Sequence, residues 1–278
     1  MQFIVKRDIL LKSLNFVQGV VEKKNTLPIL SNVLLQLKDK KLLIIATDLD
    51  IVFHDEITDV NIQKEGSTTT SAAILYDILR KIPPNSEIKF NLKDQNKLSL
   101  TSENSDFNLL CLPTDNFPTF ADEFEGSEIE LSKNNFLKLL NKTKIAISND
   151  DTRHYLNGIY LHLTEGHGRN FLTGVATDSH RLSSSSVEIQ NVGDFSSLIL
   201  PRKTVFQLIS LLAETNEKLF MQTSENKVKF SIGNIKLVSK VIDGKFPDYK
   251  KVVPTNNDKS LIVPSKDFIN CIERVTSV

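Results

Sequence analysis

The chain has 278 residues, of which 40% are hydrophobic and 24% charged, with 34 basic and 34 acidic side chains. Zero net charge argues against a protein that wraps nucleic acid through bulk positive charge, and the composition is that of an ordinary soluble globular protein. The two cysteines, Cys111 and Cys271, form no CxxC pattern, which suits a reducing cytosol and predicts a cytoplasmic location. The N-terminus lacks the apolar core of a signal peptide, and no run of 18 apolar residues predicts a transmembrane helix.

The first 121 residues predict short strands interrupted by two helices. A strand over 2–5 precedes a helix over 7–21, where apolar residues recur at helical spacing. A second helix is predicted over 72–81, with Ser71 as its N-cap and a proline pair as its end. The remaining strands are predicted over 30–37, 41–47, 51–60, 87–92, 98–102 and 107–112.

The second half of the chain repeats this order. Helices are predicted over 133–147, with Ser132 as the N-cap, and over 201–213, with Pro201 in the first turn, where proline is tolerated. Polar, proline-containing stretches over 113–126 and 243–255 are interpreted as linkers. Strands are predicted over 129–131, 156–163, 170–177, 182–189, 219–223, 227–232 and 235–241.

An internal repeat organises the chain into modules of about 130 residues, a normal domain size. Ala46-Thr47-Asp48 recurs 130 residues later as Ala176-Thr177-Asp178, and Phe117-Pro118 recurs as Phe246-Pro247. We therefore predict an α+β fold of tandem modules, each made of two β-α-β-β-β halves.

The predicted boundaries are 1–121 for the first module and 122–255 for the second, with the start of a third module over 256–278. The repeat predicts that the sequence is a truncated form of a longer, three-module protein. A lone strand and helix bury little apolar surface, so residues 260–278 are expected to be frayed or loosely docked.

The predicted helices and their ends are basic although the chain is neutral. Residues 6–24, 71–81, 133–147 and 201–213 carry thirteen basic and three acidic side chains, so the strands, loops and linkers carry the opposite excess. For any one helix, the simple interpretation is that lysine and arginine solvate an exposed face. Four helices sharing the bias predict a positive track for phosphates, which would position nucleic acid without reading its sequence and would be sensitive to salt.

Several motifs, found in register over the whole chain, resemble the beta sliding clamp of bacterial DNA polymerase III. Each motif is weak alone, and they are specific as a set. The motifs are Leu27-Pro28-Ile29-Leu30, Ala46-Thr47-Asp48, Tyr155-Leu156-Asn157-Gly158, Ala176-Thr177-Asp178-Ser179-His180-Arg181-Leu182, Pro201-Arg202-Lys203 and Asp243-Gly244-Lys245-Phe246-Pro247-Asp248-Tyr249.

The resemblance implies a ring made of two three-module subunits, with helices lining an inner, DNA-facing surface and sheets outside. Such a clamp slides on duplex DNA and gives processivity to the replicative polymerase, and it docks polymerases, the clamp loader and repair proteins through short peptides. It is a non-catalytic accessory subunit of a holoenzyme that is a DNA-directed DNA polymerase. A ring grips DNA topologically, so weak phosphate contacts are enough, and this agrees with basic helices in a neutral chain.

The resemblance also implies roles for particular residues. The positions that match DNA contacts are Lys24, Arg80, Asn149 and Lys203. The positions that match the peptide groove are Leu156, Thr177, Ser179, His180, Arg181, Leu182, Pro247, Lys251 and Val252. The positions that match the dimer interface are Ile74 and Phe107.

Three positions depart from what is common in the family. Lys24 stands where the family has arginine, which keeps the charge and loses the bidentate geometry. Ser179 stands where the family usually has glycine, and Lys251 stands where it often has arginine. The last two changes bear on which peptides the groove prefers.

Catalytic and metal-binding interpretations of the same residues are weaker. Asp178, His180 and the Ser183–Ser186 run suggest a hydrolase, yet serines along a strand alternate between its faces. Asp48 and Asp50 could be a carboxylate pair or metal ligands, but no cluster of histidine or cysteine supports this. The repeat favours a structural role in which Asp48 and Asp178 fix turns. No glycine-rich phosphate loop occurs, so neither a nucleotide nor another cofactor is expected.

Three hypotheses for the function remain open on the sequence alone. The favoured one is a processivity clamp, and the second is a truncated, monomeric clamp-like module that binds DNA or clamp-ligand peptides. The third is a soluble enzyme, for which His180→Ala would abolish turnover, whereas a clamp would lose only partner binding.

Overall fold

The computed structural model describes residues 1–22, 27–94, 96–103, 105–118, 124, 128–190 and 195–277. These residues form two compact units, Met1–Gly244 and Lys245–Val278. The first unit contains all the sheets and the first four α-helices. Among the described residues, no helix is long and apolar enough to span a membrane.

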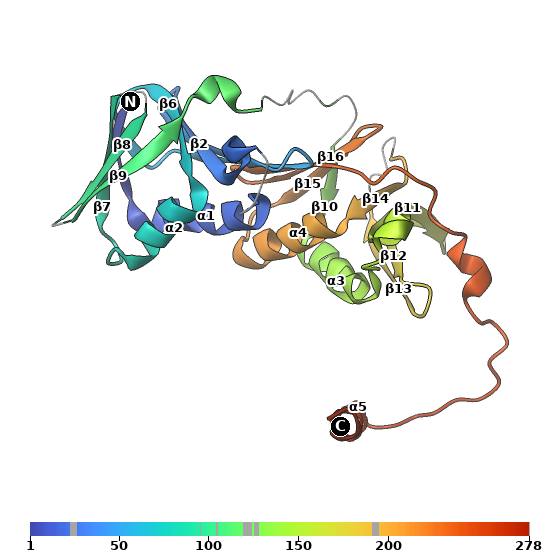
Figure 1. The fold of residues 1–278 in the computed structure, drawn as a ribbon. Coiled ribbons are helices and arrows are strands. Elements are labelled where there is room, and N and C mark those ends of the chain that lie inside the picture. Colours follow the sequence, from blue (N-terminus) through green and yellow to red (C-terminus); the bar gives the residue numbers. More distant parts are fainter. Residues whose placement is uncertain are drawn as a thin grey trace. The chain divides into compact units, whose positions relative to one another are not determined.

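The first predicted module contains two long helices and a run of antiparallel strands (Figure 1). Its elements are β1 (Gln2–Lys6), α1 (Arg7–Val20), the 3-10 helix η1 (Pro28–Ser31), β2 (Asn32–Lys38), β3 (Lys41–Thr47), β4 (Ile51–Ile57), β5 (Val60–Lys64), β6 (Gly66–Ser71), α2 (Ala72–Lys81), β7 (Glu87–Asp94), β8 (Lys97–Ser102), β9 (Ser105–Leu112) and the 3-10 helix η2 (Thr114–Asn116).

The second predicted module has the order of two β-α-β-β-β halves. Its elements are β10 (Ile129–Leu131), α3 (Lys133–Thr143), the 3-10 helices η3 (Lys144–Ala146) and η4 (Asp151–Leu156), β11 (Gly158–Gly166), β12 (Arg169–Thr177), β13 (Leu182–Ile189), β14 (Leu198–Pro201), α4 (Arg202–Glu214), β15 (Leu219–Thr223), β16 (Lys227–Ile232) and β17 (Ile235–Lys240).

One continuous sheet crosses the junction between the two modules. Its strand order is β10-β15-β16-β17-β4-β3-β2-β6-β9-β8-β7-β1-β5, and a second sheet has the order β13-β12-β11-β14. The modules meet where β17 pairs antiparallel with β4, with Val238 opposite Val52 and Leu237 opposite Phe53. Backbone hydrogen bonds therefore join the two modules directly.

The core lies between the sheets and the helices, which cover one side of the sheets in Figure 1. Leu10, Leu14 and Val17 of α1 are fully buried, as helical spacing of apolar residues requires. Strands alternate as expected, since Ile44 of β3 is buried in this core while its neighbour Ile45 is only half-buried. The prediction of helices on one side and sheets on the other is confirmed.

The second module confirms the predicted pair of β-α-β-β-β halves, but the first module adds a strand. The predicted strand over 51–60 is in fact two strands, because the chain turns at Thr58, whose carbonyl accepts from the Val60 amide at 3.0 Å. The predicted halves require a strand before α2 and before α4, but the sequence analysis assigns no residue range to β6 or β14. These strands precede α2 and α4, and both begin where no apolar alternation marks a strand.

The two predicted N-caps have different outcomes. The Ser71 hydroxyl accepts from the Ile74 amide at 3.4 Å, which confirms the cap of α2. Ser132 occupies the predicted N-cap position of α3, but its side chain makes no capping hydrogen bond, and its carbonyl accepts from the Phe136 amide at 2.9 Å. The predicted helix over 133–147 is also too long, since α3 ends at Thr143 and a 3-10 turn follows.

The second unit contains the 3-10 helix η5 (Tyr249–Val252) and the helix α5 (Ser265–Val275). The helix has no buried residue, and Phe268, Ile269 and Ile272 on its surface are each about half exposed. The expectation that residues 260–278 are frayed stays a prediction.

Candidate functional site

The turn between β12 and β13 is held by two side chains at its start. The Asp178 carboxylate accepts from the backbone amides of His180 and Arg181, both at 3.0 Å. The Thr177 hydroxyl accepts from the Ser179 amide at 3.1 Å and donates to the Arg181 carbonyl at 2.7 Å. Four hydrogen bonds within five residues therefore fix how His180 and Arg181 leave the turn.

The electrostatics of Asp178 follow from the same contacts. The backbone amides of Arg181 and His180 stabilise its charged form and hold the pKa of this carboxyl below its usual range. The second oxygen accepts from Nε of Arg181 at 2.9 Å, and the Arg181 side chain is 63% exposed. Asp178 therefore fixes its turn, as predicted, and it also orients the Arg181 side chain.

Ser179 occupies an unusual backbone conformation at the tip of this turn. Its φ is +76°, in the left-handed region that favours glycine. This conformation explains why glycine, which lacks a Cβ atom, suits the position that Ser179 occupies in this chain. The Ser179 hydroxyl accepts from Nη1 of Arg153 at 2.7 Å, and Nε of Arg153 is paired with Asp150 at 2.8 Å. The sequence predicts no role for Arg153. It lies 26 positions before Ser179 along the chain, so no local sequence pattern links the two residues.

Two further groove candidates, Leu182 and Leu156, lie on β13 and on the 3-10 helix η4. Leu182 is half-buried and begins β13, directly after the turn. Leu156 ends the 3-10 helix η4, which also carries Arg153, and it is 2% exposed. The half-buried Leu182 can therefore offer apolar surface, whereas Leu156 acts mainly as a packed support.

The first module contains the same turn between β3 and β4. The Asp48 carboxylate accepts from the amides of Asp50 at 2.9 Å and Ile51 at 2.8 Å. The Thr47 hydroxyl accepts from the Leu49 amide at 2.9 Å, and Leu49 has a φ of +82°. Asp48 thus fixes a turn as predicted, and the internal repeat holds at the level of single hydrogen bonds.

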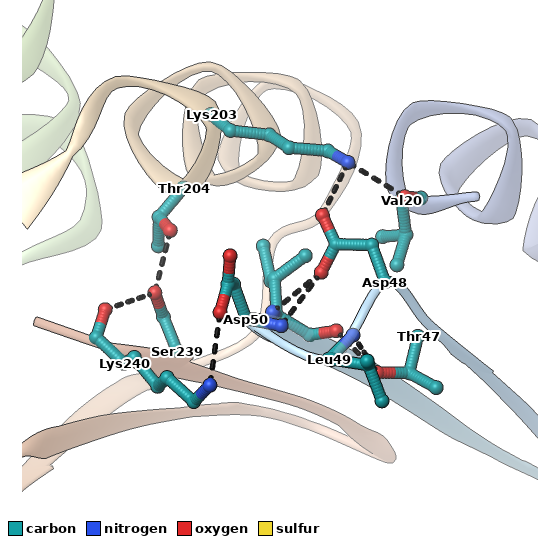
Figure 2. A network of polar contacts seen from close by, with 10 residues as sticks. Val20, Thr47, Asp48, Leu49, Asp50, Lys203, Thr204, Ser239 and Lys240 are labelled. Atoms are coloured by element: carbon teal, nitrogen blue, oxygen red, sulfur yellow. Dashed lines mark hydrogen bonds and ion pairs between the residues drawn. The ribbon is translucent and has the colours of Figure 1, made fainter. Parts of the chain in front are cut away.

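A contact between modules distinguishes the two turns (Figure 2). Nζ of Lys203, on α4, donates to the Asp48 carboxylate at 2.5 Å and to the Val20 carbonyl, at the end of α1, at 2.7 Å. Asp48 is only 6% exposed there. Beside it, the Lys240 amide donates to the Asp50 carbonyl at 2.8 Å. The predicted DNA contact Lys203 is therefore also a tie between the two modules.

The other DNA candidates have different surroundings. Lys24 lies outside the described residues. Arg80 is exposed at the end of α2, with its guanidinium 5.7 Å from the centroid of the Tyr76 ring. Asn149 is exposed, and its side-chain oxygen accepts from Nη1 of Arg202 at 2.5 Å.

Arg202 belongs to a second group of cations on the helical side that sequence reasoning did not single out. The Phe206 ring on α4 is 41% exposed and has the Arg202 guanidinium 5.2 Å from its centroid. Nζ of Lys144, at the end of α3, lies 5.9 Å from the same centroid. Facing helices thus present an exposed aromatic ring between two cations, an arrangement that suits a phosphate backbone.

Two family descriptions match this chain. "DNA polymerase III beta subunit, N-terminal domain" matches residues 1–121, and "DNA polymerase III beta subunit, central domain" matches residues 130–248. The chain belongs to the beta sliding clamp family. Its function is that of a DNA sliding clamp, as the sequence motifs predicted.

Individual relatives agree with this assignment. The beta sliding clamp of Caulobacter vibrioides is 38% identical over 280 residues, which cover all of this chain and 75% of the relative. That of Escherichia coli K12 is 37% identical over 261 residues, covering 94% of this chain and 70% of the relative.

Solved structures of sliding clamps share the fold. The Caulobacter crescentus pol III beta structure has a TM-score of 0.92 and 38% identity, and the match covers all of this chain and 75% of that one. A DnaN sliding clamp from Bartonella birtlesii bound to griselimycin has a TM-score of 0.93 and 40% identity, covering 99% of this chain and 73% of that one.

The remaining peptide-groove candidates of this sliding clamp lie in the second unit. Lys251 and Val252 are in the 3-10 helix η5, and Pro247 precedes it. Val252 is 69% exposed, and Nζ of Lys251 pairs with Asp248 at 3.3 Å. A groove shared by these residues and the Thr177–Leu182 turn stays a prediction.

The two candidates for the clamp's dimer interface come together. Ile74 of α2 is 54% exposed, and both Ile74 and Phe107 of β9 line a cavity of about 480 Å³. Leu110, further along β9, is 84% exposed. Leu110 lies on the face of β9 opposite to Phe107, so the shared cavity supports only the pairing of Ile74 with Phe107.

The hydrolase and metal interpretations find no support in the geometry. Ser183 donates to the Lys142 carbonyl at 2.7 Å, and Ser186 bonds to Thr173 at 2.8 Å. Asp178 uses both oxygens to hold its turn. Within the described ranges, no three histidine, cysteine, aspartate or glutamate side chains come close enough to hold a metal ion.

Proposed function

We propose that this sliding clamp faces duplex DNA with its helices and docks partner proteins at the Thr177–Leu182 turn. The helices lie on one side of the sheets, and the exposed Arg80 and the half-buried Lys144 and Arg202 lie on or beside them. This segregation in a chain of zero net charge is the observation that carries the proposal. Contacts to phosphates alone bind without sequence preference and leave the clamp free to slide.

The partners that fit the turn are short peptides with apolar tails from polymerase subunits, the clamp loader and repair proteins. Leu182 supplies apolar surface, while His180 and Arg181 leave a rigid turn in fixed directions. Leu156, Thr177, Ser179, Pro247, Lys251 and Val252 complete the proposed peptide-binding set. The DNA-binding set is Lys24, Arg80, Asn149 and Lys203, to which we add Arg202.

A homodimeric ring is the assembly that we propose. Ile74 and Phe107 line one cavity, and Ile74 is 54% exposed, which would place an interface at this edge of the first module. The domain boundaries at residues 121 and 255 belong to the same proposal. The clamp acts as a non-catalytic subunit in the cytoplasm, and a monomeric clamp-like binder is the alternative if the cavity does not mediate dimerisation.

The DNA-facing side is tested by fluorescence anisotropy with a labelled duplex of random sequence at low salt. We expect weak binding that declines with salt, and a loss of at least about tenfold in the double variant Arg80→Glu, Arg202→Glu. The matched control is Lys89→Glu, Lys218→Glu, which makes the same charge change at an exposed position of β7 and at the exposed residue just before β15. Equal losses in both double variants would contradict the proposed DNA-facing side.

A further inference from the structure

One aromatic ring on the helical side is exposed although its helix is otherwise well packed. Phe206 of α4 is 41% exposed, whereas Val205 and Leu208 on the same helix are fully buried. Among the described residues of Met1–Gly244, every other phenylalanine or tyrosine side chain is buried or half-buried. The helix therefore turns a single aromatic ring of this unit away from the core and toward solvent.

Two helices place positive charge around this ring. α3 and α4 pack against each other (Figure 1), and Phe206 lies one turn after Arg202 on the same face of α4. The Arg202 guanidinium is 5.2 Å from the ring centroid, and Nζ of Lys144, which directly follows α3, is 5.9 Å from it. Because Phe206 remains exposed with both cations in place, part of the ring is open to a ligand.

The charge of both cations is available to a ligand. Nη1 of Arg202 donates to Oδ1 of Asn149 at 2.5 Å, and Nζ of Lys144 donates to Oδ1 of Asn141 at 2.7 Å, so both acceptors are neutral amides. Within the part of the chain that the structure describes, neither cation pairs with a carboxylate. α3 contains no acidic residue, and α4 contains only Glu214, at its last position. The ring therefore lies in a surface region that keeps its positive charge.

An exposed ring beside such cations favours one form of DNA over another. Duplex DNA presents its phosphates and sugars outward, and cations alone are enough to contact them. In a single strand the flat faces of the bases are accessible as well. Proteins that bind single strands without sequence preference combine cations for the backbone with aromatic rings on which the bases stack. The phenyl ring offers no hydrogen-bond donor to a phosphate, so an unpaired base is the part of DNA that it suits.

We propose that Arg202, Phe206 and Lys144 form a binding site for single-stranded DNA. An unpaired base stacks on the Phe206 ring beside the planar Arg202 guanidinium, and Lys144 pairs with a neighbouring phosphate. The inference rests on the proposed DNA-facing side and goes beyond it, because the contacts that let a clamp slide on duplex DNA involve no base. The site gives the helical side a grip on an unpaired strand whatever its sequence.

The test uses the full chain and a short oligothymidine that carries one 2-aminopurine, whose fluorescence falls when the base stacks on an aromatic ring. At low salt we expect saturable binding with quenching of the 2-aminopurine signal. Phe206→Leu keeps an apolar side chain and removes the ring, so it should abolish the quenching and weaken single-strand binding about fivefold or more. The affinity for a blunt duplex, measured by anisotropy, should change by less than about twofold, because the phosphate contacts remain.

Two further variants separate stacking from a general loss of apolar surface. Phe206→Tyr retains an aromatic ring and should retain both the quenching and the affinity. Ile145→Ala shortens an aliphatic side chain that is 60% exposed and follows Lys144 in the sequence, and it should leave both unchanged.

Each other result overturns the inference. Unchanged quenching and affinity in Phe206→Leu, or equal losses in Phe206→Leu and Ile145→Ala, would show that no base stacks on this ring. Equal weakening of single-strand and duplex binding would assign Phe206 to the duplex contact. Duplex binding without binding of the oligothymidine would likewise leave the proposed DNA-facing side standing and remove the single-strand site, whereas binding of neither DNA would overturn both.

Discussion

The two copies of the Thr-Asp turn have the same hydrogen bonds and opposite surroundings. Asp48 is 6% exposed and is held by Lys203 from the neighbouring module, whereas Asp178 is 22% exposed and is paired with Arg181 of its own turn. The strand after the first copy, β4, pairs with β17. Among the described residues, the strand after the second copy, β13, pairs with β12 alone. One local sequence therefore serves as a joint where a module covers it and as an open surface where none does.

Removing the carboxylate from each turn should give the largest difference in stability between the two turns. Asp48→Ala leaves two backbone amides and the Lys203 ammonium without their acceptor at a buried position, so we expect the free energy of unfolding in urea to fall by about 2–3 kcal/mol. Asp178→Ala should lower the free energy of unfolding by less, because water can hydrogen-bond to the backbone amides of this more exposed turn. Equal losses in the two variants would show that the first turn is not a joint.

The inter-module tie itself can be tested with two lysines. Lys203→Met keeps much of the side-chain volume and removes the ammonium that joins Asp48 and Val20, which should lower the free energy of unfolding by about 1–2 kcal/mol. Lys240→Met is the control, since its pair with Asp50 is exposed on both sides and should contribute at most about 0.5 kcal/mol. A larger effect at Lys240 would contradict the assignment of Lys203 as the tie.

Glycine variants at the two turn tips, where φ is positive, should differ by a smaller amount in their stabilising effect. Ser179→Gly relieves the left-handed strain at an exposed tip and loses only an exposed hydrogen bond from Arg153, so it should raise the free energy of unfolding by about 0.5 kcal/mol, after the entropy of the unfolded glycine is offset. Leu49→Gly relieves the same strain but loses apolar contacts in the cavity of about 510 Å³ that Leu49 lines together with Leu34 and Val238, so it should gain less or nothing. Urea titrations of both variants would measure the difference, and a larger gain at Leu49 would be evidence against the cavity's apolar lining.

The smallest expected effect is on the pH dependence. Because the native contacts of Asp178 lower its pKa, the stability that it contributes is present above the unfolded pKa, and it is lost as the pH falls through the folded pKa. Asp178→Asn should therefore flatten the acid limb of a plot of unfolding free energy against pH, below about pH 5. An unchanged limb would mean that these hydrogen bonds do not persist in solution.

Local sequence predicted the turns but not what covers them. The repeated Ala-Thr-Asp identified both copies, because aspartate fixes a turn through backbone amides only two and three residues away. The role of Lys203 could not be predicted in the same way, since it contacts a residue 155 positions distant. The cavity that Leu49 lines likewise combines Leu34 with Val238, which only the sheet register brings together. β14 was missed because it has four residues and leads directly into α4.

The central claim is that the Thr177–Leu182 turn is the open docking surface, and a fluorescence anisotropy titration with a labelled peptide ending in Leu-Phe tests it most directly. We expect saturable binding that Leu182→Asp abolishes. The matched control Ile145→Asp replaces another exposed aliphatic side chain of the same module, 60% exposed, and should leave binding intact. Binding that Leu182→Asp does not change, or no binding at millimolar peptide, would contradict the claim.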